Sequence, residues 1–314
     1  MSVDTSSLSL SLVIDPMRRL LKFLLYTLLA LVAVALVGLG YVYFASSRLL
    51  AKTYAVTPPP VAVAHGDPAV IEHGRYLANK VSMCTECHGE DLGGKVFMDA
   101  MPVMARLWGT NLTRGRGGIG STYTDADFVR VLTHGVKKDG RAALFMPSQD
   151  YHFSEADLAG LIAYIRSVPP VDRETPAPAV GPMARILTLA GAFPLLPAEM
   201  IRHDAVRLAP PPDRTTPAKS GEYLVSTGGC RGCHGPNLTG EGGMPDAANL
   251  TPIGLAGWSA ADFTRALRDG KRPNGTDIKP EMPRVFGTMS DQDLESLFAY
   301  LQSLPAAGKK SKYQ

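Results

Sequence analysis

The chain has 314 residues, of which 45% are hydrophobic and 19% charged, with 25 prolines and 31 glycines. This composition is typical of a loop-rich globular protein and excludes a disordered chain, and the length suits an anchor followed by two domains. The net charge of +3 arises within residues 1–52, and the rest is balanced. No basic stripe with interleaved aromatic residues occurs, so we expect no nucleic-acid partner.

The first predicted element is a membrane-spanning helix within residues 1–52. No charged residue occurs between Phe23 and Ser47, and at about 1.5 Å per residue this run is longer than a bilayer core is thick. Three basic residues closely precede the run and modestly favour a cytoplasmic N-terminus. A cleaved signal peptide is the alternative, because residues 45–47 are small, but its apolar region is normally about 7–15 residues long. We therefore expect an uncleaved single-pass anchor.

An internal repeat follows the anchor, after a proline-containing segment, 53–70, that predicts an extended tether. The recurring motifs are Gly74-x-Tyr76-Leu77 with Gly221-x-Tyr223-Leu224, Asn111-Leu112-Thr113 with Asn249-Leu250-Thr251, Asp127-Phe128 with Asp262-Phe263, and Met146-Pro147 with Met282-Pro283. A repeat of this length indicates a duplicated domain. The expected domains are 71–170 and 217–306, joined by an inter-domain segment, 171–216, and followed by a basic tail, 307–314.

Helix-start signals recur in both copies. They are Thr124-x-x-Asp127 and Ser154-x-x-Asp157 in the first copy and Ser259-x-x-Asp262 and Ser290-x-x-Asp293 in the second. In each, the hydroxyl is placed to cap a backbone amide, and the acidic residue suits the positive end of a helix. No comparable alternation predicts strands, so we expect an all-α fold. The apolar stretch from Met183 to Ile201 is expected to pack across the two domains, with contact to the membrane surface or to a partner as the alternative.

The four cysteines form two Cys-x-x-Cys-His motifs, Cys84-Thr85-Glu86-Cys87-His88 and Cys230-Arg231-Gly232-Cys233-His234. In such a motif the two thiols bond the haem vinyl groups and the histidine binds the iron. The sequence therefore predicts two covalently bound haem c groups. Because this attachment takes place outside the cytoplasm, we expect both domains in the periplasm, held at a bacterial inner membrane.

An electron carrier needs both axial positions of each iron filled. Met146 and Met282 occupy matched positions in the repeat, and methionine as the sixth ligand raises the potential relative to more basic ligands. The expected iron ligands are His88, Met146, His234 and Met282. The rivals that stay open are His134, His152, Met98, Met101 and Met104 in the first copy and Met244 and Met289 in the second.

Together these motifs resemble class I cytochrome c domains, in particular those in the multihaem cytochrome subunits of membrane-bound alcohol and gluconate dehydrogenases. The resemblance covers residues 66–170 and 217–306, and the chain has two haem motifs where those subunits have three. The predicted N-terminal anchor is a second departure from those subunits. The resemblance implies two tandem cytochrome c domains, so the expected all-α architecture is a transmembrane helix followed by these two domains. It also implies that a glycine of the first helix packs against an aromatic residue of the last, which corresponds to Gly74 with Tyr164 and Gly221 with Tyr300.

The leading hypothesis is a membrane-anchored dihaem cytochrome c that transfers electrons between respiratory or photosynthetic complexes on the periplasmic side. The expected partners are redox proteins such as a quinol-oxidising complex, a dehydrogenase, a terminal oxidase or a reaction centre. The alternative is the cytochrome subunit of a membrane dehydrogenase or oxidase complex. A dihaem peroxidase, which needs one displaceable iron ligand, is the third hypothesis. We predict no catalytic residues and an electron carrier or subunit rather than an enzyme.

Overall fold

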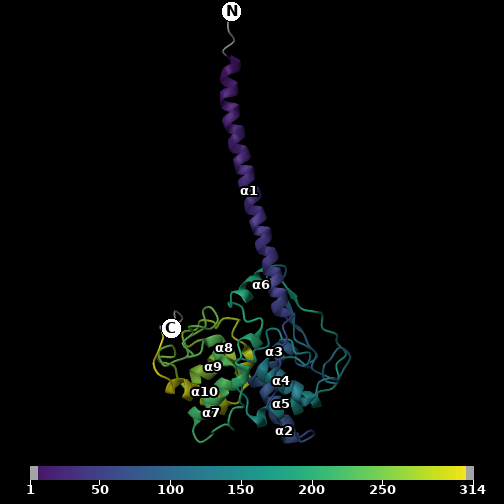
Figure 1. Ribbon diagram of the computed structural model, residues 1–314. Helices are drawn as coiled ribbons and strands as arrows, with labels where there is room; N and C mark the ends of the chain where they lie inside the picture. The colour runs from purple at the N-terminus through teal and green to yellow at the C-terminus, as the bar shows by residue number, and fades with distance from the viewer. Residues whose placement is uncertain (1–5, 309–314) are drawn as a thin grey trace, which may run out of the picture.

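The structure, a computed structural model, describes residues 6–308, with the side chains of the first helix described from residue 17. The helix α1 (Ser6–Leu50) projects from a head made of two helical modules (Figure 1). Its span Met17–Leu50 is long and apolar enough to cross a membrane, and its most apolar window is not buried. Residues 309–314 of the predicted basic tail lie outside the described residues.

Each module is built from short helices around one attachment motif (Figure 1). The elements of the first module are α2 (Pro68–Tyr76), the π-helical turn η1 (Leu77–Val81), α3 (Cys84–His88), β1 (Val96–Asp99), β2 (Ala105–Trp108), α4 (Asp125–His134) and α5 (Glu155–Ser167). The elements of the second module are α7 (Pro217–Thr227), α8 (Cys230–His234), α9 (Ala260–Asp269), η4 (Arg284–Thr288) and α10 (Asp291–Ser303). The segment between them contains β3 (Ala179–Val180), α6 (Pro182–Leu189), η2 (Pro197–Glu199) and η3 (His203–Ala205).

The first and last helices of each module cross in close backbone contact. A Cβ atom on Gly74 of α2 would lie 1.8 Å from the Gly160 carbonyl oxygen of α5, so no larger residue fits there. In the second module a Cβ on Gly221 of α7 would lie 1.9 Å from the Ser296 carbonyl oxygen of α10, and 2.8 Å from the Cβ of Tyr300. The first helix therefore meets the last helix of its module through a glycine in both copies.

The predicted helix starts are present in both modules. Thr124 and Ser259 each form a capping box with the aspartate three residues later, at the starts of α4 and α9. Ser154 and Ser290 accept from the backbone N–H three residues later, at the starts of α5 and α10. The mostly helical fold is confirmed, and the helix-start motifs lie at the helix N-termini where the repeat predicts them.

A small antiparallel sheet, with the strand order β1-β2-β3, adds to the helical fold. Val96 pairs with Trp108 between β1 and β2, and Ala105 pairs with Val180 between β2 and β3. We did not predict these strands, because they are two to four residues long. Strands this short carry no alternation that a sequence pattern detects, and their pairing depends on contacts far along the chain.

The segment between the modules packs on the first module and on the end of α1, not across both modules as we expected for residues 183–201. Leu195 lies in one buried cluster with Leu107, and Leu196 lies in another with Val136. The apolar residues of this segment pack on the first module because β3, which belongs to the segment, pairs with β2 of that module. Residues 53–70, expected as a tether, run along the first module, where the Tyr54 N–H donates to the Gly140 carbonyl at 2.8 Å.

The second module holds the first through Tyr223 of α7. Its hydroxyl donates to a carboxylate oxygen of Asp157 and accepts from the backbone N–H of Ser154 at 2.9 Å. Ser154 is the N-cap residue of α5 and Asp157 lies in its first turn, and both are almost fully buried. His73 of α2 also contacts the Asp157 carboxylate, at 2.7 Å. One tyrosine thus connects the second module to the capped start of a first-module helix.

The first module holds the second in the same way through Tyr76 of α2. Its hydroxyl donates to Asp293 and accepts from the Ser290 N–H at 2.9 Å, at the start of α10. Tyr76 and Tyr223 are equivalent in the repeat, and so are the serine and aspartate that each contacts. Equivalent residues that exchange equivalent contacts indicate an approximate two-fold relation between the modules.

Candidate cofactor sites

Each attachment motif forms a short helix, α3 or α8, directly after a residue with left-handed backbone. These residues are Met83, with φ of 53°, and Gly229, with φ of 67°. Burial raises the pKa of the Cys84 and Cys230 thiols to about 12, although both residues keep some exposed surface. A buried, protonated thiol is a poor thiolate ligand or redox nucleophile, so this environment suits covalent attachment to an apolar group.

The histidine of each motif is oriented by a backbone carbonyl. His88 Nδ1 lies 2.7 Å from the Thr110 carbonyl oxygen, and His234 Nδ1 lies 2.8 Å from that of Ala248. Because a carbonyl only accepts, Nδ1 carries the proton and the lone pair on Nε2 is free for a metal. Burial lowers the pKa of both imidazoles, which keeps them neutral. Both histidines are therefore prepared for iron binding.

The Asn-Leu-Thr motif explains why these carbonyls are held in place. Asn111, which follows Thr110, donates through its side-chain amide to the Val171 carbonyl at 2.7 Å, beyond the end of α5. Asn249, which follows Ala248, donates to the carbonyl of Ala307 at 2.9 Å, beyond the end of α10. In both copies the motif fastens the loop that orients the histidine to the segment that follows the last helix.

The candidate methionine ligands lie beside the core that contains the attachment cysteines. Met146 and Met282 are partly buried against this core, together with Cys84 and Cys230. Among the rival methionines, Met98 and Met104 pack in the separate cluster around the sheet, Met101 and Met244 are exposed, and Met289 is buried in the main core.

The rival histidines have other surroundings. His134 is buried, and its Nδ1 lies 3.1 Å from Nδ1 of His203 in the segment between the modules. His152 is exposed, and its backbone N–H donates to the Ser226 carbonyl at 3.2 Å. His134 is thus paired with another histidine, while His152 contributes to the contact between the modules.

Two buried donors test whether the sites fit haem. Trp108 Nε1 and Arg231 Nη1 are buried without a hydrogen-bond partner among the described residues, although Arg231 Nη2 donates to the Tyr300 hydroxyl at 2.9 Å. Trp108 precedes a glycine whose Cβ would lie 2.0 Å from the carbonyl oxygen of Cys87, so it is close to the first motif. Buried donors need acceptors, and haem propionates supply them. The residues present therefore fit one haem in each module.

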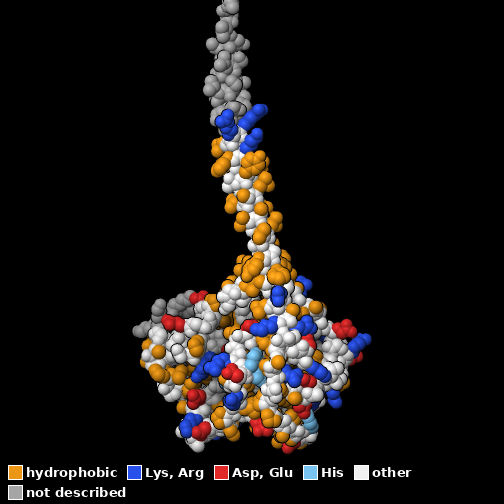
Figure 2. Space-filling view, in the orientation of Figure 1, with side chains coloured by type: hydrophobic (Ala, Val, Ile, Leu, Met, Phe, Trp, Pro, Cys, Tyr) orange, Lys and Arg blue, Asp and Glu red, His pale blue; other side chains and the backbone are white. Residues whose placement is uncertain are grey.

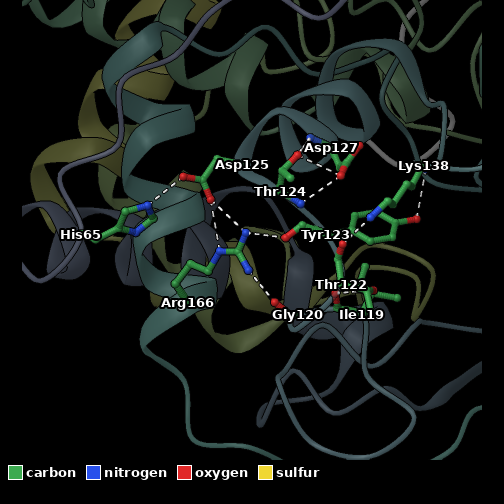
Figure 3. A network of polar contacts seen from close by, with 10 residues as sticks. All are labelled: His65, Ile119, Gly120, Thr122, Tyr123, Thr124, Asp125, Asp127, Lys138 and Arg166. Carbon is green, nitrogen blue, oxygen red and sulfur yellow. Dashed lines mark hydrogen bonds and ion pairs between the residues drawn. The ribbon is translucent and has the colours of Figure 1, made fainter.

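A polar network fixes the loop between the Asn-Leu-Thr motif and α4 in the first module (Figure 3). Arg166 of α5 donates to the carbonyls of Gly120 and Tyr123, at 2.5 and 2.7 Å, and pairs with Asp125 at 3.0 Å. His65 contacts the same carboxylate at 2.7 Å (Figure 3). The guanidinium thus connects the loop to both the last helix and the start of α4.

The two attachment motifs lie close to each other across the contact between the modules. Ser82, two residues before the first motif, donates to the Thr227 carbonyl at 3.0 Å, at the end of α7. The buried Tyr151 donates to the Ser82 carbonyl at 2.6 Å. A Cβ on Gly229 would lie 3.0 Å from the Tyr151 ring. One aromatic ring is therefore packed between the residues that precede Cys84 and Cys230.

Asp150, the neighbour of Tyr151 in the chain, lies at the same contact. A Cβ on Gly232, inside the second motif, would lie 2.5 Å from an Asp150 carboxylate oxygen. Burial raises the pKa of Asp150 to about 6, although the amide of Gln149 donates to it at 2.7 Å and lowers that pKa. The carboxylate of a first-module residue therefore lies beside the attachment motif of the second module.

Sequence reasoning found the cysteines, histidines and methionines but missed the residues between the motifs. Tyr151 and Asp150 occupy no recurring position that we used, and only the three-dimensional contact reveals their role. Tyr76 and Tyr223 did carry a signal, because a tyrosine recurs at this position of the repeat. A recurring polar residue outside the haem motif is therefore worth testing as an interface residue.

Comparisons with known proteins agree with this geometry. Residues 218–305 match the family described as cytochrome c, and residues 69–165 match cytochrome c oxidase, cbb3-type, subunit III. The fructose dehydrogenase cytochrome subunit of Gluconobacter japonicus is 27% identical over 82% of this chain and 56% of its own length. The alcohol dehydrogenase (quinone) cytochrome c subunit of Gluconacetobacter polyoxogenes is 27% identical over 83% and 60%. This chain thus spans less than two thirds of either dehydrogenase subunit.

A third relative has a length closer to that of this chain. The dihaem cytochrome c-type of Cereibacter sphaeroides is 31% identical over 60% of this chain and 68% of its own length. The matched families cover both modules, and each module contains one complete Cys-x-x-Cys-His motif. The chain belongs to the cytochrome c family, and its two cytochrome c domains carry two haem c groups for electron transfer.

Proposed function

We propose that this chain is the cytochrome subunit of a membrane-bound dehydrogenase. In this role it accepts electrons from a substrate-oxidising subunit and passes them through both haems to an acceptor at the membrane. The similarity to two dehydrogenase cytochrome subunits favours this alternative over a carrier between respiratory or photosynthetic complexes.

The observation that carries the electron path is the contact between the two attachment motifs. Ser82 and Thr227 are buried and joined by a hydrogen bond, and Tyr151 is packed against both sides. Electron transfer weakens steeply with the distance between the donor and the acceptor. The short separation of the two attachment motifs therefore supports direct electron transfer from one haem to the other within this chain.

We further propose that His88 and Met146 bind the first iron and His234 and Met282 the second. The haem supplies one-electron chemistry, and the chain holds each imidazole with a free Nε2. The matched burial of the two methionines beside the attachment cysteines supports the assignment. The pairing of His134 with another histidine supports it too.

The end of α1 supports an anchor that stays on the mature protein in the inner membrane, with the head in the periplasm. Leu49 and Leu50 are partly buried against the first module. Lys52 forms an ion pair with Glu199 in the segment between the modules. Ser46, inside the candidate cleavage site, is also buried, and its hydroxyl accepts from Arg185 of α6 at 2.7 Å, so cleavage at 45–47 would disrupt a packed contact between α1 and the head.

Affinity purification of the tagged full chain from mildly solubilised native membranes tests the subunit assignment. We expect a substrate-oxidising subunit in a fixed ratio to the chain, and we expect its substrate to reduce both haems of the purified complex. Met282→Ala serves as the matched control, because it alters one haem and leaves the rest of the surface intact. This variant should retain the partner while reduction of the second haem falls.

Two results would overturn the assignment. One is recovery of the chain with a quinol-oxidising complex or a terminal oxidase, and the other is recovery without any stoichiometric partner. Either result favours a free dihaem carrier, the second candidate function. The similarity to the dihaem cytochrome c-type of Cereibacter sphaeroides is the observation that supports this candidate.

A further inference from the structure

Exposed apolar side chains gather on the face of the head from which α1 leaves. Met183, Ile186 and Leu189 follow one another along one side of α6 and are all exposed, Ile186 by 42%. Met101 and Val103 lie beside them, because the Met183 N–H donates to the Val103 carbonyl at 3.0 Å. We call these five residues the apolar collar. Figure 2 shows hydrophobic side chains around the base of α1 at this place.

The opposite side of α6 is fixed to the head. Ala184 is fully buried in the cluster that contains Leu107 and Leu195. The helix therefore has one side in the protein core and one apolar side without a partner among the described residues. Exposed apolar patches of this kind mark surfaces that contact a membrane or another protein.

The position of α6 along α1 identifies the occupant. The guanidinium of Arg185 lies 4.6 Å from the centre of the Tyr43 ring, and its Nη1 donates to the Ser46 hydroxyl at 2.7 Å. These contacts fasten α6 to the last turns of the uncharged run from Phe23 to Ser47. That run is about 37 Å long, whereas a bilayer core is about 30 Å thick. With the run centred on the core, α6 lies level with the lipid headgroups.

The charges at this level suit a lipid surface. Arg48 is exposed directly after the uncharged run, and its guanidinium lies 5.7 Å from the Phe44 ring. A basic side chain at the end of an apolar helix can reach the phosphate groups of the lipid headgroups. Aromatic residues such as Phe44 are common at the same level of the membrane. Amphipathic helices at such an interface insert their apolar side about 5–10 Å into the boundary between headgroups and acyl chains.

We propose that the apolar collar inserts into the outer-leaflet interface of the bilayer that α1 spans. The head then lies against the membrane in a fixed orientation, and does not hang from a flexible link. Its occupant is lipid, because α1 crosses lipid at this same face and any other occupant would have to displace it. The proposal rests on the proposed anchor at α1, and it holds whether the chain is a subunit or a free carrier.

Cysteine labelling of the full-length holoprotein in lipid vesicles tests the proposal. The four native cysteines are bonded to haem, so Ile186→Cys introduces one reactive thiol into the collar. Ala69→Cys is the matched control, because Ala69 is also exposed and lies on α2, at the end of the head opposite α1 (Figure 1). The protein is purified without partners, reconstituted in vesicles of phosphatidylethanolamine and phosphatidylglycerol, and treated with a membrane-impermeant maleimide.

We expect Ile186→Cys to react at least about tenfold more slowly than Ala69→Cys in these vesicles, because its side chain is withdrawn from water. Met183→Cys should behave like Ile186→Cys and serves as a second collar position if one variant fails to bind haem. Equal reaction rates at the collar and at Ala69 would overturn the proposal. So would a collar that reacts freely in vesicles and is protected only in native membranes, since a partner protein would then cover it.

Discussion

Replacing Tyr223 with phenylalanine tests whether the two modules stabilise each other. The substitution removes the hydroxyl that accepts from the Ser154 N–H and donates to Asp157, residues that are 1% and 2% exposed. A hydrogen bond to a charged group contributes about 1.5–3 kcal/mol, and water cannot easily replace it here. His73 still contacts the carboxylate, which limits the loss. We therefore expect the free energy of unfolding to fall by about 2 kcal/mol.

Tyr76→Phe is the matched control from the other copy of the repeat. It removes the same two bonds, to the Ser290 N–H and to Asp293, but Ser290 is exposed and Asp293 is only partly buried. Water then replaces the lost hydroxyl, and the expected loss is about 0.5–1 kcal/mol. The equivalent substitutions should therefore differ although they remove the same chemical group.

Denaturant unfolding of the holoprotein, followed by haem absorbance and far-ultraviolet circular dichroism, measures both losses. If the modules uncouple, the two probes also separate, because each module then unfolds on its own. Equal losses for the two variants, or a larger loss for Tyr76→Phe, would refute the reasoning from burial.

The pH dependence gives a second check on the Tyr223 bond. Burial alone would raise the pKa of Asp157, but the hydrogen bonds from His73 and Tyr223 lower it overall. A carboxyl with a lowered pKa contributes stability above its unfolded pKa and loses it as the pH falls through the folded pKa. The cost of Tyr223→Phe should therefore shrink as the pH falls from about 4 toward the lowered folded pKa of Asp157, because a protonated carboxyl no longer forms the charge-assisted bond.

Three further predictions concern the haem sites and the helix crossing. Met282→Ala and Met146→Ala should each lower the potential and change the ferric absorption spectrum of a different haem, and an unchanged first haem in Met146→Ala would point to another ligand. Asp150, whose pKa burial raises to about 6, should make the potential of the second haem fall as the pH rises through that value, because a nearby negative charge favours ferric iron. Asp150→Asn should remove this slope in spectroelectrochemical titrations. Gly221→Ala should cost about 1–3 kcal/mol in thermal unfolding, since its Cβ would lie 1.9 Å from the Ser296 carbonyl oxygen.

The parts of the fold that depend on local chemistry could be predicted from the sequence. Thr124 and Ser259 precede an aspartate by three residues, and this spacing alone predicts the start of a helix. The attachment motifs are equally local, because both thiols and the imidazole must reach one haem. Comparison of the two copies then singled out Met146 and Met282, whose assignment as ligands stays a prediction.

The parts that depend on contacts between distant residues could not be predicted. Tyr151 reaches the Ser82 carbonyl across 69 residues of sequence, and Tyr76 reaches Asp293 across 217. No period or motif connects such positions in one sequence. The same limit explains the missed strands, because the pairing of Ala105 with Val180 depends on how the inter-module segment returns to the first copy.

A difference in loop length between the two copies accounts for their different surroundings. The carbonyl that orients the histidine follows it by 22 residues in the first copy, at Thr110, and by 14 in the second, at Ala248. The longer loop of the first copy contains β1 and β2, and β2 pairs with β3 next to α6. The second module has the shorter loop and, among its described residues, no strand equivalent to β2, so it offers no strand with which β3, directly before α6, could pair. The duplicated haem site is thus preserved in both modules, while the contact with α1 belongs to the first module because only that copy contains the sheet.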